Sequence, residues 1–163
     1  MTARRRWKPV VAAALAAIAI AVLGALSTDL GVWYQSLRQP TWKPPDALFG
    51  PAWTLNYALA ALAGVRAWDA ATDATEREWL LALFALNGFL NLLWSLLFFR
   101  LQRPDWALAE VGFLWASILL LMVVTGRHSR TTSLLLAPYL VWVSFAAALN
   151  LAVVRLNGPF NAG

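Results

Sequence analysis

The chain has 163 residues, of which 61% are hydrophobic and 13% charged, whereas an average soluble domain has about 45–50% apolar and about 25% charged residues. These few polar side chains could not cover a soluble surface, which excludes a soluble globular domain and a disordered chain. The net charge of +5 is carried by short basic clusters between apolar runs, a pattern typical of membrane anchoring rather than of nucleic-acid binding.

Five stretches almost free of charge define the predicted elements. Each is about 19–24 residues long, which suits a helix that crosses about 30 Å of hydrocarbon at 1.5 Å per residue. None alternates with the two-residue period of a membrane β-strand. We therefore expect an all-α membrane protein, a bundle of five transmembrane helices in one domain over residues 1–163. The predicted spans are residues 9–30, 47–68, 78–99, 105–125 and 132–156.

The first span has two interpretations. Arg4, Arg5 and Arg6 followed by an apolar run imitate a secretory signal peptide, but the run is longer than the 7–15 residues of a typical signal core. This favours a retained helix. Alanines at positions 13, 17, 21 and 25 recur every four residues, and such a small-residue stripe lets membrane helices approach closely.

The basic residues predict the orientation in the membrane. Lys and Arg divide eight to five between the two sides, and most of the excess lies in the cluster Arg4, Arg5, Arg6 and Lys8. Because cytoplasmic loops carry the excess of basic residues, the division predicts a cytoplasmic N-terminus and a C-terminus outside.

The first connection, residues 30–46, is long and rich in tryptophan and proline. Pro40, Pro44 and Pro45 forbid a continuous helix there. Long ordered loops usually serve as lids or binding loops, but a strap that lies on the bundle, with Trp33 and Trp42 as interfacial anchors, is equally consistent with the sequence. We expect this loop to be ordered and leave both roles open.

Polar and aromatic residues recur at helical spacing inside the later spans. Polar groups in hydrocarbon are costly unless they are paired or face a cavity, so these residues predict an apolar cavity lined by indole and phenol rings. Plain packing between helices is the alternative for each of them. The residues are Trp53, Asn56, Tyr57, Asn87, Asn91, Trp94, Ser95, Glu110, Trp115, Tyr139, Trp142, Phe145 and Asn150.

The remaining tryptophans lie near predicted span ends, where indoles form the interfacial belt. These are Trp7, Trp68, Trp79 and Trp106.

Residues for conventional catalysis are few. The chain has no cysteine, and its single histidine, His128, lies in a connection at the membrane surface. We find no triad spacing, no glycine-rich phosphate loop and no paired carboxylates on one helix face, and we predict no metal site. A bound tetrapyrrole would lack the usual protein ligands for haem iron and would be held by its face and edges.

The first loop and several later segments carry a family signature. Trp33-Tyr34, Leu37, the run from Pro40 to Pro45, and Pro51-Ala52-Trp53 resemble the TspO/MBR family, the tryptophan-rich sensory proteins whose animal members are called translocator protein or peripheral-type benzodiazepine receptor. Further matches are Asn87 with Asn91, the segment from Pro138 to Trp142, Leu149-Asn150, and Arg155-Leu156-Asn157. The resemblance covers residues 33–157.

This resemblance implies a five-helix bundle, usually a homodimer, with a pocket under the first loop that binds porphyrins such as protoporphyrin IX and, in some members, benzodiazepine-type drugs. No cofactor is implied, since the porphyrin is a ligand. Trp53 and Trp142 match positions used in the light- and oxygen-dependent porphyrin breakdown of some bacterial members. The implied pocket residues are Tyr34, Trp53, Tyr57, Asn91, Trp94, Ser95, Trp142 and Ala146.

One segment departs from the family pattern. Leu151 stands where the cholesterol-recognition stretch of animal members needs a tyrosine, which argues against sterol binding through that segment. The short chain suggests a bacterial member in the cell (inner) membrane. The resemblance leaves three functions open: a receptor or sensor for tetrapyrroles, a porphyrin carrier, and a porphyrin-degrading enzyme.

Overall fold

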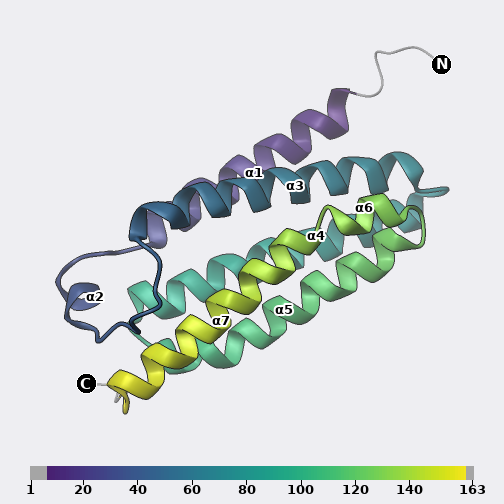
Figure 1. Cartoon of the computed structure of the whole chain (residues 1–163). Coiled ribbons are helices and arrows are strands. Elements are labelled where there is room, and N and C mark those ends of the chain that lie inside the picture. Colours follow the sequence, from purple (N-terminus) through teal and green to yellow (C-terminus); the bar gives the residue numbers. More distant parts are fainter. Residues whose placement is uncertain (1–6, 161–163) are drawn as a thin grey trace.

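The computed structural model describes residues 7–160, in which five long helices form an elongated bundle (Figure 1). Three short helices and one π-helical turn lie beside the long helices or extend them. The elements in chain order are α1 (Trp7–Ser27), α2 (Val32–Ser36), η2 (Asp46–Leu48), α3 (Phe49–Ala70), α4 (Ala74–Ser95), η3 (Leu96–Arg100), α5 (Pro104–Gly126), α6 (Arg130–Leu134) and α7 (Ala137–Asn157).

Five helical stretches are long and apolar enough to cross a membrane, which confirms the predicted fold class. They begin and end within four residues of the predicted spans; the third joins α4 with η3, and the fifth joins α6 with α7. The stretches are Trp7–Ser27, Asp46–Ala70, Ala74–Arg100, Pro104–Gly126 and Arg130–Asn157. The arginine cluster that predicts the orientation, at residues 4–6, lies outside the described residues.

Local sequence signals explain where several helices begin. Asp73 caps α4 by accepting a hydrogen bond from the Glu76 backbone N–H at 2.8 Å, and the Glu76 carboxylate accepts one from the Thr72 backbone N–H at 2.7 Å. This reciprocal pair satisfies donors that a helix start leaves free. Pro104 opens α5 and Pro138 lies in the first turn of α7, where the missing N–H costs no helical hydrogen bond.

The helices pack in a closed order around the bundle. α1 packs against α3 and, less extensively, against α4. α5 packs closely between α4 and α7, and contact between α3 and α7 closes the order. The first apolar run is thus part of the bundle, as expected for a retained span. We call the end beneath the first loop the cavity end and the opposite end, with the connections at 71–73 and 127–129, the far end (Figure 1).

Small and branched residues fill the far end. Ala63, Leu121 and Leu136 pack together there with at most 1% exposure, and Ala67 packs with Leu80 nearby. At the surface of this end, the His128 imidazole lies 2.9 Å from the Glu76 carboxylate and links the connection at 127–129 to the first turn of α4. The far end is therefore a packed core closed by polar connections.

Candidate functional site

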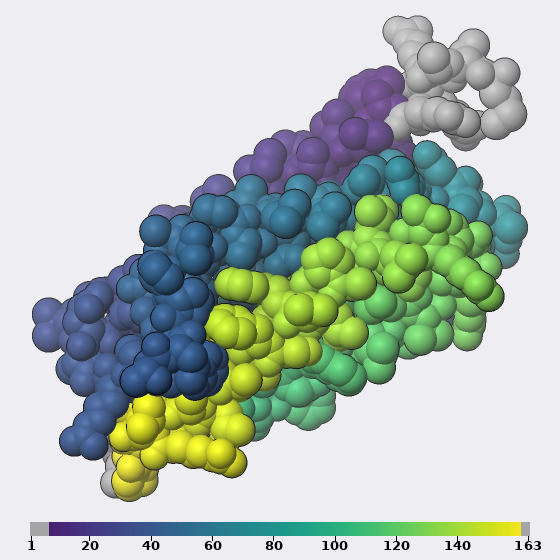
Figure 2. All heavy atoms as spheres, viewed as in Figure 1, coloured from purple at the N-terminus to yellow at the C-terminus, as the bar shows by residue number. Residues whose placement is uncertain are grey.

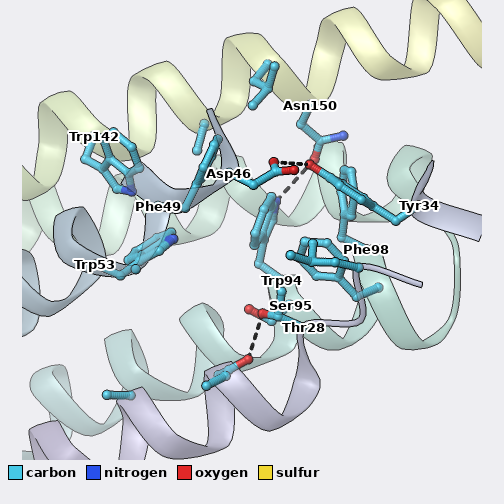
Figure 3. Close-up of a pocket in the computed structure, with 18 of the residues that line it drawn as sticks. Thr28, Tyr34, Asp46, Phe49, Trp53, Trp94, Ser95, Phe98, Trp142 and Asn150 are labelled. Atoms are coloured by element: carbon cyan, nitrogen blue, oxygen red, sulfur yellow. Dashed lines mark hydrogen bonds between the residues drawn. The ribbon is translucent and has the colours of Figure 1, made fainter. Parts of the chain in front are cut away.

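A cavity of about 420 Å³ lies at the cavity end, between α1, α3, α4 and α7 and beneath the first loop. Its volume is within the range of about 300–1,000 Å³ typical of small-molecule sites. Aromatic rings from five different segments face it, as Figure 3 shows for several of them. The aromatic lining residues are Tyr34, Phe49, Trp53, Tyr57, Trp94, Phe98, Phe99 and Trp142.

One wall of the cavity is built from indoles of α3 and α7. The Trp53 ring stacks on Tyr57 at a centroid distance of 5.6 Å and meets Trp142 edge to face at 6.2 Å. Phe49 also packs edge to face against Trp142, at a centroid distance of 5.6 Å. Such perpendicular contacts are favourable for aromatic pairs, so the rings hold one another in place at the border of the cavity.

The opposite wall is formed where α4 passes into the π-helical turn η3. Trp94 packs on Phe98 at 5.4 Å, and Phe98 on Phe99 at 4.8 Å. The indole N–H of Trp94 donates to the Asn150 side chain at 3.2 Å, and the Asn150 amide donates to the Pro104 carbonyl at 2.8 Å. These hydrogen bonds fix the orientation of Trp94 against α7.

The first loop both covers the cavity and is fastened to the bundle. Its Trp33 and Tyr34 rings pack on Phe98 and Phe99, and Trp42 packs on Phe145. Tyr34 is buried and also lines the cavity. The loop is therefore a strap and a cover at once, which combines the two roles that the sequence left open.

A polar cluster holds the loop where it returns to α3. The Tyr34 hydroxyl donates to the Asp46 carboxylate at 3.1 Å, Lys43 forms a salt bridge with Asp46, and its ammonium lies 5.5 Å from the centre of the Tyr34 ring. Burial raises the pKa of the Tyr34 phenol, although the nearby Lys43 opposes this. Burial disfavours the Lys43 charge, but its interactions with Asp46 and Tyr34 outweigh this and raise the pKa of Lys43.

Asn157 fastens the middle of the loop to the end of α7. Its side-chain carbonyl accepts from the Arg38 backbone N–H at 2.7 Å, and its amide donates to the Arg38 carbonyl at 2.9 Å. Because each partner both donates and accepts, the contact fixes the position and the direction of the loop backbone at Arg38.

Behind the cavity, a chain of side-chain hydrogen bonds runs across the bundle. The Tyr57 hydroxyl donates to Asn91 at 2.6 Å, and the Asn91 amide donates to the Tyr139 hydroxyl at 3.1 Å. Tyr139 donates to Asn87 at 3.2 Å, and Asn87 donates to Ser117 at 2.9 Å. The chain links α3, α4, α7 and α5 and separates the cavity from the packed far end.

The structure brings the predicted pocket residues to one place. Tyr34, Trp53, Tyr57, Trp94, Ser95, Trp142 and Ala146 line the cavity. Asn91 does not line it but positions Tyr57 from behind.

Six other residues that the spacing suggested lie outside the cavity lining; two of them, Asn87 and Tyr139, belong to the hydrogen-bonded chain behind it. Trp115 is 37% exposed and donates to Ser144 across the outer face of α5 and α7. Glu110 is buried, and its carboxylate has no hydrogen-bond partner among the described residues. Asn56 and Phe145 border a separate groove between α3 and α7.

Sequence reasoning missed the contribution of α1 and of the phenylalanines. Ala21, Gly24 and Ala25 of α1, with Thr28 just after it, line the cavity. The alanine stripe was an available signal, but we interpreted it as a helix-packing surface; it is also a wall whose small side chains leave room. Phe98 and Phe99 gave no signal, because apolar residues near a span end are ordinary.

No three histidine, cysteine, aspartate or glutamate side chains within residues 7–160 come together as a metal site. Asp46 is the one acidic residue in the lining, and its carboxylate is already paired with Lys43. The cavity therefore offers aromatic faces and a few hydrogen-bonding groups.

Comparison with known proteins agrees with this architecture. The model of the TspO/MBR family matches residues 11–156. The chain is 42% identical over 149 residues to the Tryptophan-rich protein TspO of Archaeoglobus fulgidus, covering 90% of this chain and 95% of that protein. It is 40% identical to the Tryptophan-rich protein TspO of Chlorobaculum tepidum (77% and 79% covered) and 30% identical to the Translocator protein of Homo sapiens (80% and 78% covered).

The match spans all five membrane helices, and the relatives are aligned over most of their length. Together with the five apolar helices, this makes the protein an integral multi-pass membrane protein. From these matches we conclude that the chain belongs to the TspO/MBR family.

Proposed function

We propose that this protein is a membrane receptor that binds a tetrapyrrole, such as protoporphyrin IX, in the cavity beneath the first loop and thereby influences porphyrin handling or stress regulation. The observation that carries the proposal is the lining itself: two aromatic walls, one from Trp53 and Trp142 and one from Trp94 and Phe98, border a single cavity of about 420 Å³.

The shape and chemistry of this cavity suit a flat, mostly apolar ligand. Indole and phenyl faces stack on large ring systems, and each aromatic pair contributes roughly 0.5–1.5 kcal/mol beyond its buried area. The small residues Ala21, Gly24 and Ala25 on α1 leave space on the remaining side. A macrocycle could therefore lie against aromatic walls while its polar edge meets the few hydrogen-bonding groups of the lining.

The same walls favour a second candidate, porphyrin breakdown. Trp53 and Trp142 contact each other and both border the cavity, so an easily oxidised indole pair would lie against a bound, light-excited porphyrin in the presence of oxygen. Product above one equivalent per protein, formed only under light and oxygen, would favour a degrading enzyme over a receptor. Uptake into sealed vesicles would instead favour a carrier.

Titration of the purified full-length chain with protoporphyrin IX, followed by tryptophan quenching, tests the proposal. Trp53→Phe and Trp142→Phe each keep an apolar ring but lose ring area and the indole N–H, so each should weaken binding a few-fold, in line with about 0.5–1.5 kcal/mol per aromatic contact. The control is Trp79→Phe, because Trp79 is 66% exposed on the outside of α4. Equal binding by all three variants would show that the cavity is not the porphyrin site.

A further inference from the structure

The hydrogen-bond donors of the cavity lining fall into two groups, those already used within the protein and those left without a partner. A hydroxyl has a single hydrogen, and each hydroxyl of the lining donates it to another group of the protein. These hydroxyls belong to Thr28, Tyr34, Thr54, Tyr57 and Ser95. The N–H groups of Trp94 and Asn150 are also bonded to protein acceptors.

Two buried donors of the same lining have no acceptor among the described residues. They are the side-chain amide nitrogen of Gln39, from the loop, and the indole nitrogen of Trp142, from α7. Buried donors without a partner are rare in native proteins, because each costs about 1–3 kcal/mol. The indole nitrogen of Trp53 also donates to none of the described residues, and the Trp53 ring meets Trp142 edge to face on the same wall (Figure 3).

The backbone around Gln39 is fixed on both sides, so its side chain is presented at a defined place. Arg38, just before it, is held by two hydrogen bonds with Asn157, one donated by each residue. Pro40, just after it, restricts the backbone of Gln39 to extended conformations, and the Pro40 carbonyl accepts from the Lys43 N–H at 3.0 Å. The loop backbone therefore fixes where the Gln39 side chain leaves the chain, at the border of the cavity.

We infer that Gln39 and Trp142 are specificity-determining donors that bind acceptor oxygens on the edge of the ligand. The inference rests on the proposed function, and it narrows the ligand class to tetrapyrroles that carry carboxylate or carbonyl oxygens at their periphery. A macrocycle with only alkyl substituents fills the same space but leaves both donors unpaired. Since Lys43 already neutralises Asp46, this carboxylate does not repel an anionic ligand edge, so either a carbonyl or a carboxylate can accept from the two donors.

Three porphyrins with the same ring test which edge groups the two donors recognise. They are protoporphyrin IX with its two carboxylates, its dimethyl ester with carbonyl oxygens only, and an all-alkyl porphyrin with neither. Binding to the full-length chain in lipid nanodiscs is measured for each. The parent protein should bind the first two roughly tenfold more tightly than the third, because a hydrogen bond from a buried donor contributes about that factor.

Variants separate the effect of the two donors on porphyrin affinity from differences in how the porphyrins partition into lipid. Gln39→Leu should reduce the preference for protoporphyrin IX over the all-alkyl porphyrin several-fold, and Gln39→Glu, with the same size but no donor, should reduce it further. Trp142→Phe should weaken the binding of all three porphyrins through lost ring area. Any additional loss of affinity for protoporphyrin IX and its ester measures the contribution of the indole N–H. Gln35→Leu is the matched control, since Gln35 lies outside the lining and its amide donates to the Leu30 carbonyl at 3.2 Å.

The outcomes separate the two proposals. If none of the porphyrins binds, the proposed function fails. If the parent binds all three equally, or if Gln39→Leu and Trp142→Phe keep the full preference of the parent, the cavity still binds tetrapyrroles but the donor assignment is wrong. Equal affinity for the acid and the ester, with weaker binding of the all-alkyl porphyrin, supports neutral acceptor recognition. Tighter binding of the acid shows that the charge is also recognised.

Discussion

The two ends of the bundle are built from different apolar residues and differ in how tightly these residues are packed. At the far end, Ala63, Leu121 and Leu136 are packed with at most 1% exposure. At the cavity end, Trp53 and Trp142 remain half-buried and border an open volume. Figure 2 shows the outer surface continuous along the helices, with the loop residues covering the bundle at the cavity end. Helical spacing of apolar and aromatic residues alone therefore does not distinguish a core from a binding cavity.

Two features produce the difference. On α1, small residues face the cavity where larger ones would fill it. Along the middle of the bundle, the hydrogen-bonded chain from Tyr57 to Ser117 leaves its polar groups paired and aligned. Because paired polar groups hold helices together in a membrane, this layer stabilises the far end and supports the cavity without occupying it.

The largest expected effect concerns stability. Tyr139 is 1% exposed and joins two links of the hydrogen-bonded chain, so Tyr139→Ala should lower the free energy of unfolding by about 3–5 kcal/mol, the usual cost of a buried aromatic replaced by alanine. Trp53→Ala, at the cavity wall, should destabilise far less and lose more porphyrin affinity. Thermal and denaturant unfolding in detergent measure both. Equal destabilisation would show that the cavity wall is as tightly packed as the core.

Filling the cavity should abolish most of the binding without loss of the fold. A Cβ added at Gly24 lies 3.8 Å from the Tyr57 hydroxyl, which is ordinary contact, so the backbone tolerates a side chain there. In Gly24→Phe the ring occupies the cavity, and protoporphyrin IX affinity should fall at least tenfold, about 1.4 kcal/mol. Gly112→Phe is the control, because the space around Gly112 is open. Unchanged binding in Gly24→Phe would place the ligand elsewhere.

Much of the fold and of the cavity lining could be predicted from the sequence, but some of the lining could not. Charge-free stretches predict the five helices, and the resemblance to the family predicts seven of the lining residues. The cavity wall on α1 was not predicted, because a small residue that leaves space has the same sequence pattern as one that permits packing. Trp115 and Glu110, for which the sequence left cavity lining and packing open, lie outside the lining. Helical spacing fixes which residues share a face but not which neighbour that face meets.

Alkaline pH should loosen the cover of the cavity more modestly. The pKa values of Tyr34 and Lys43 are raised above their ordinary values of 10.0 and 10.5, so both groups hold their protons more tightly in the folded loop. Their contribution is complete below about pH 10 and declines as the pH rises through the raised values. Limited proteolysis of the loop should therefore accelerate above pH 10, and less so in Lys43→Met. A rate independent of pH in the parent would exclude this cluster as a fastening.

The smallest expected effect is that of a central metal ion on porphyrin affinity. The cavity lining contains no histidine and the chain no cysteine, so haem should bind within a few-fold of metal-free protoporphyrin IX. Parallel titrations with the two compounds measure the ratio. A preference for haem of a hundredfold, about 2.7 kcal/mol, would reveal an axial ligand to the iron.

The clasp between Arg38 and Asn157 also has a consequence for biosynthesis. These residues are 119 positions apart in the chain, and chains are made from the N-terminus onward. While the first four long helices enter the membrane, the loop has emerged and can pack on Phe98 and Phe99, but its fastening point at Asn157 has not been synthesised. A nascent chain that ends before residue 157 should therefore leave the loop open to added protease, whereas a chain released after the last helix should protect it.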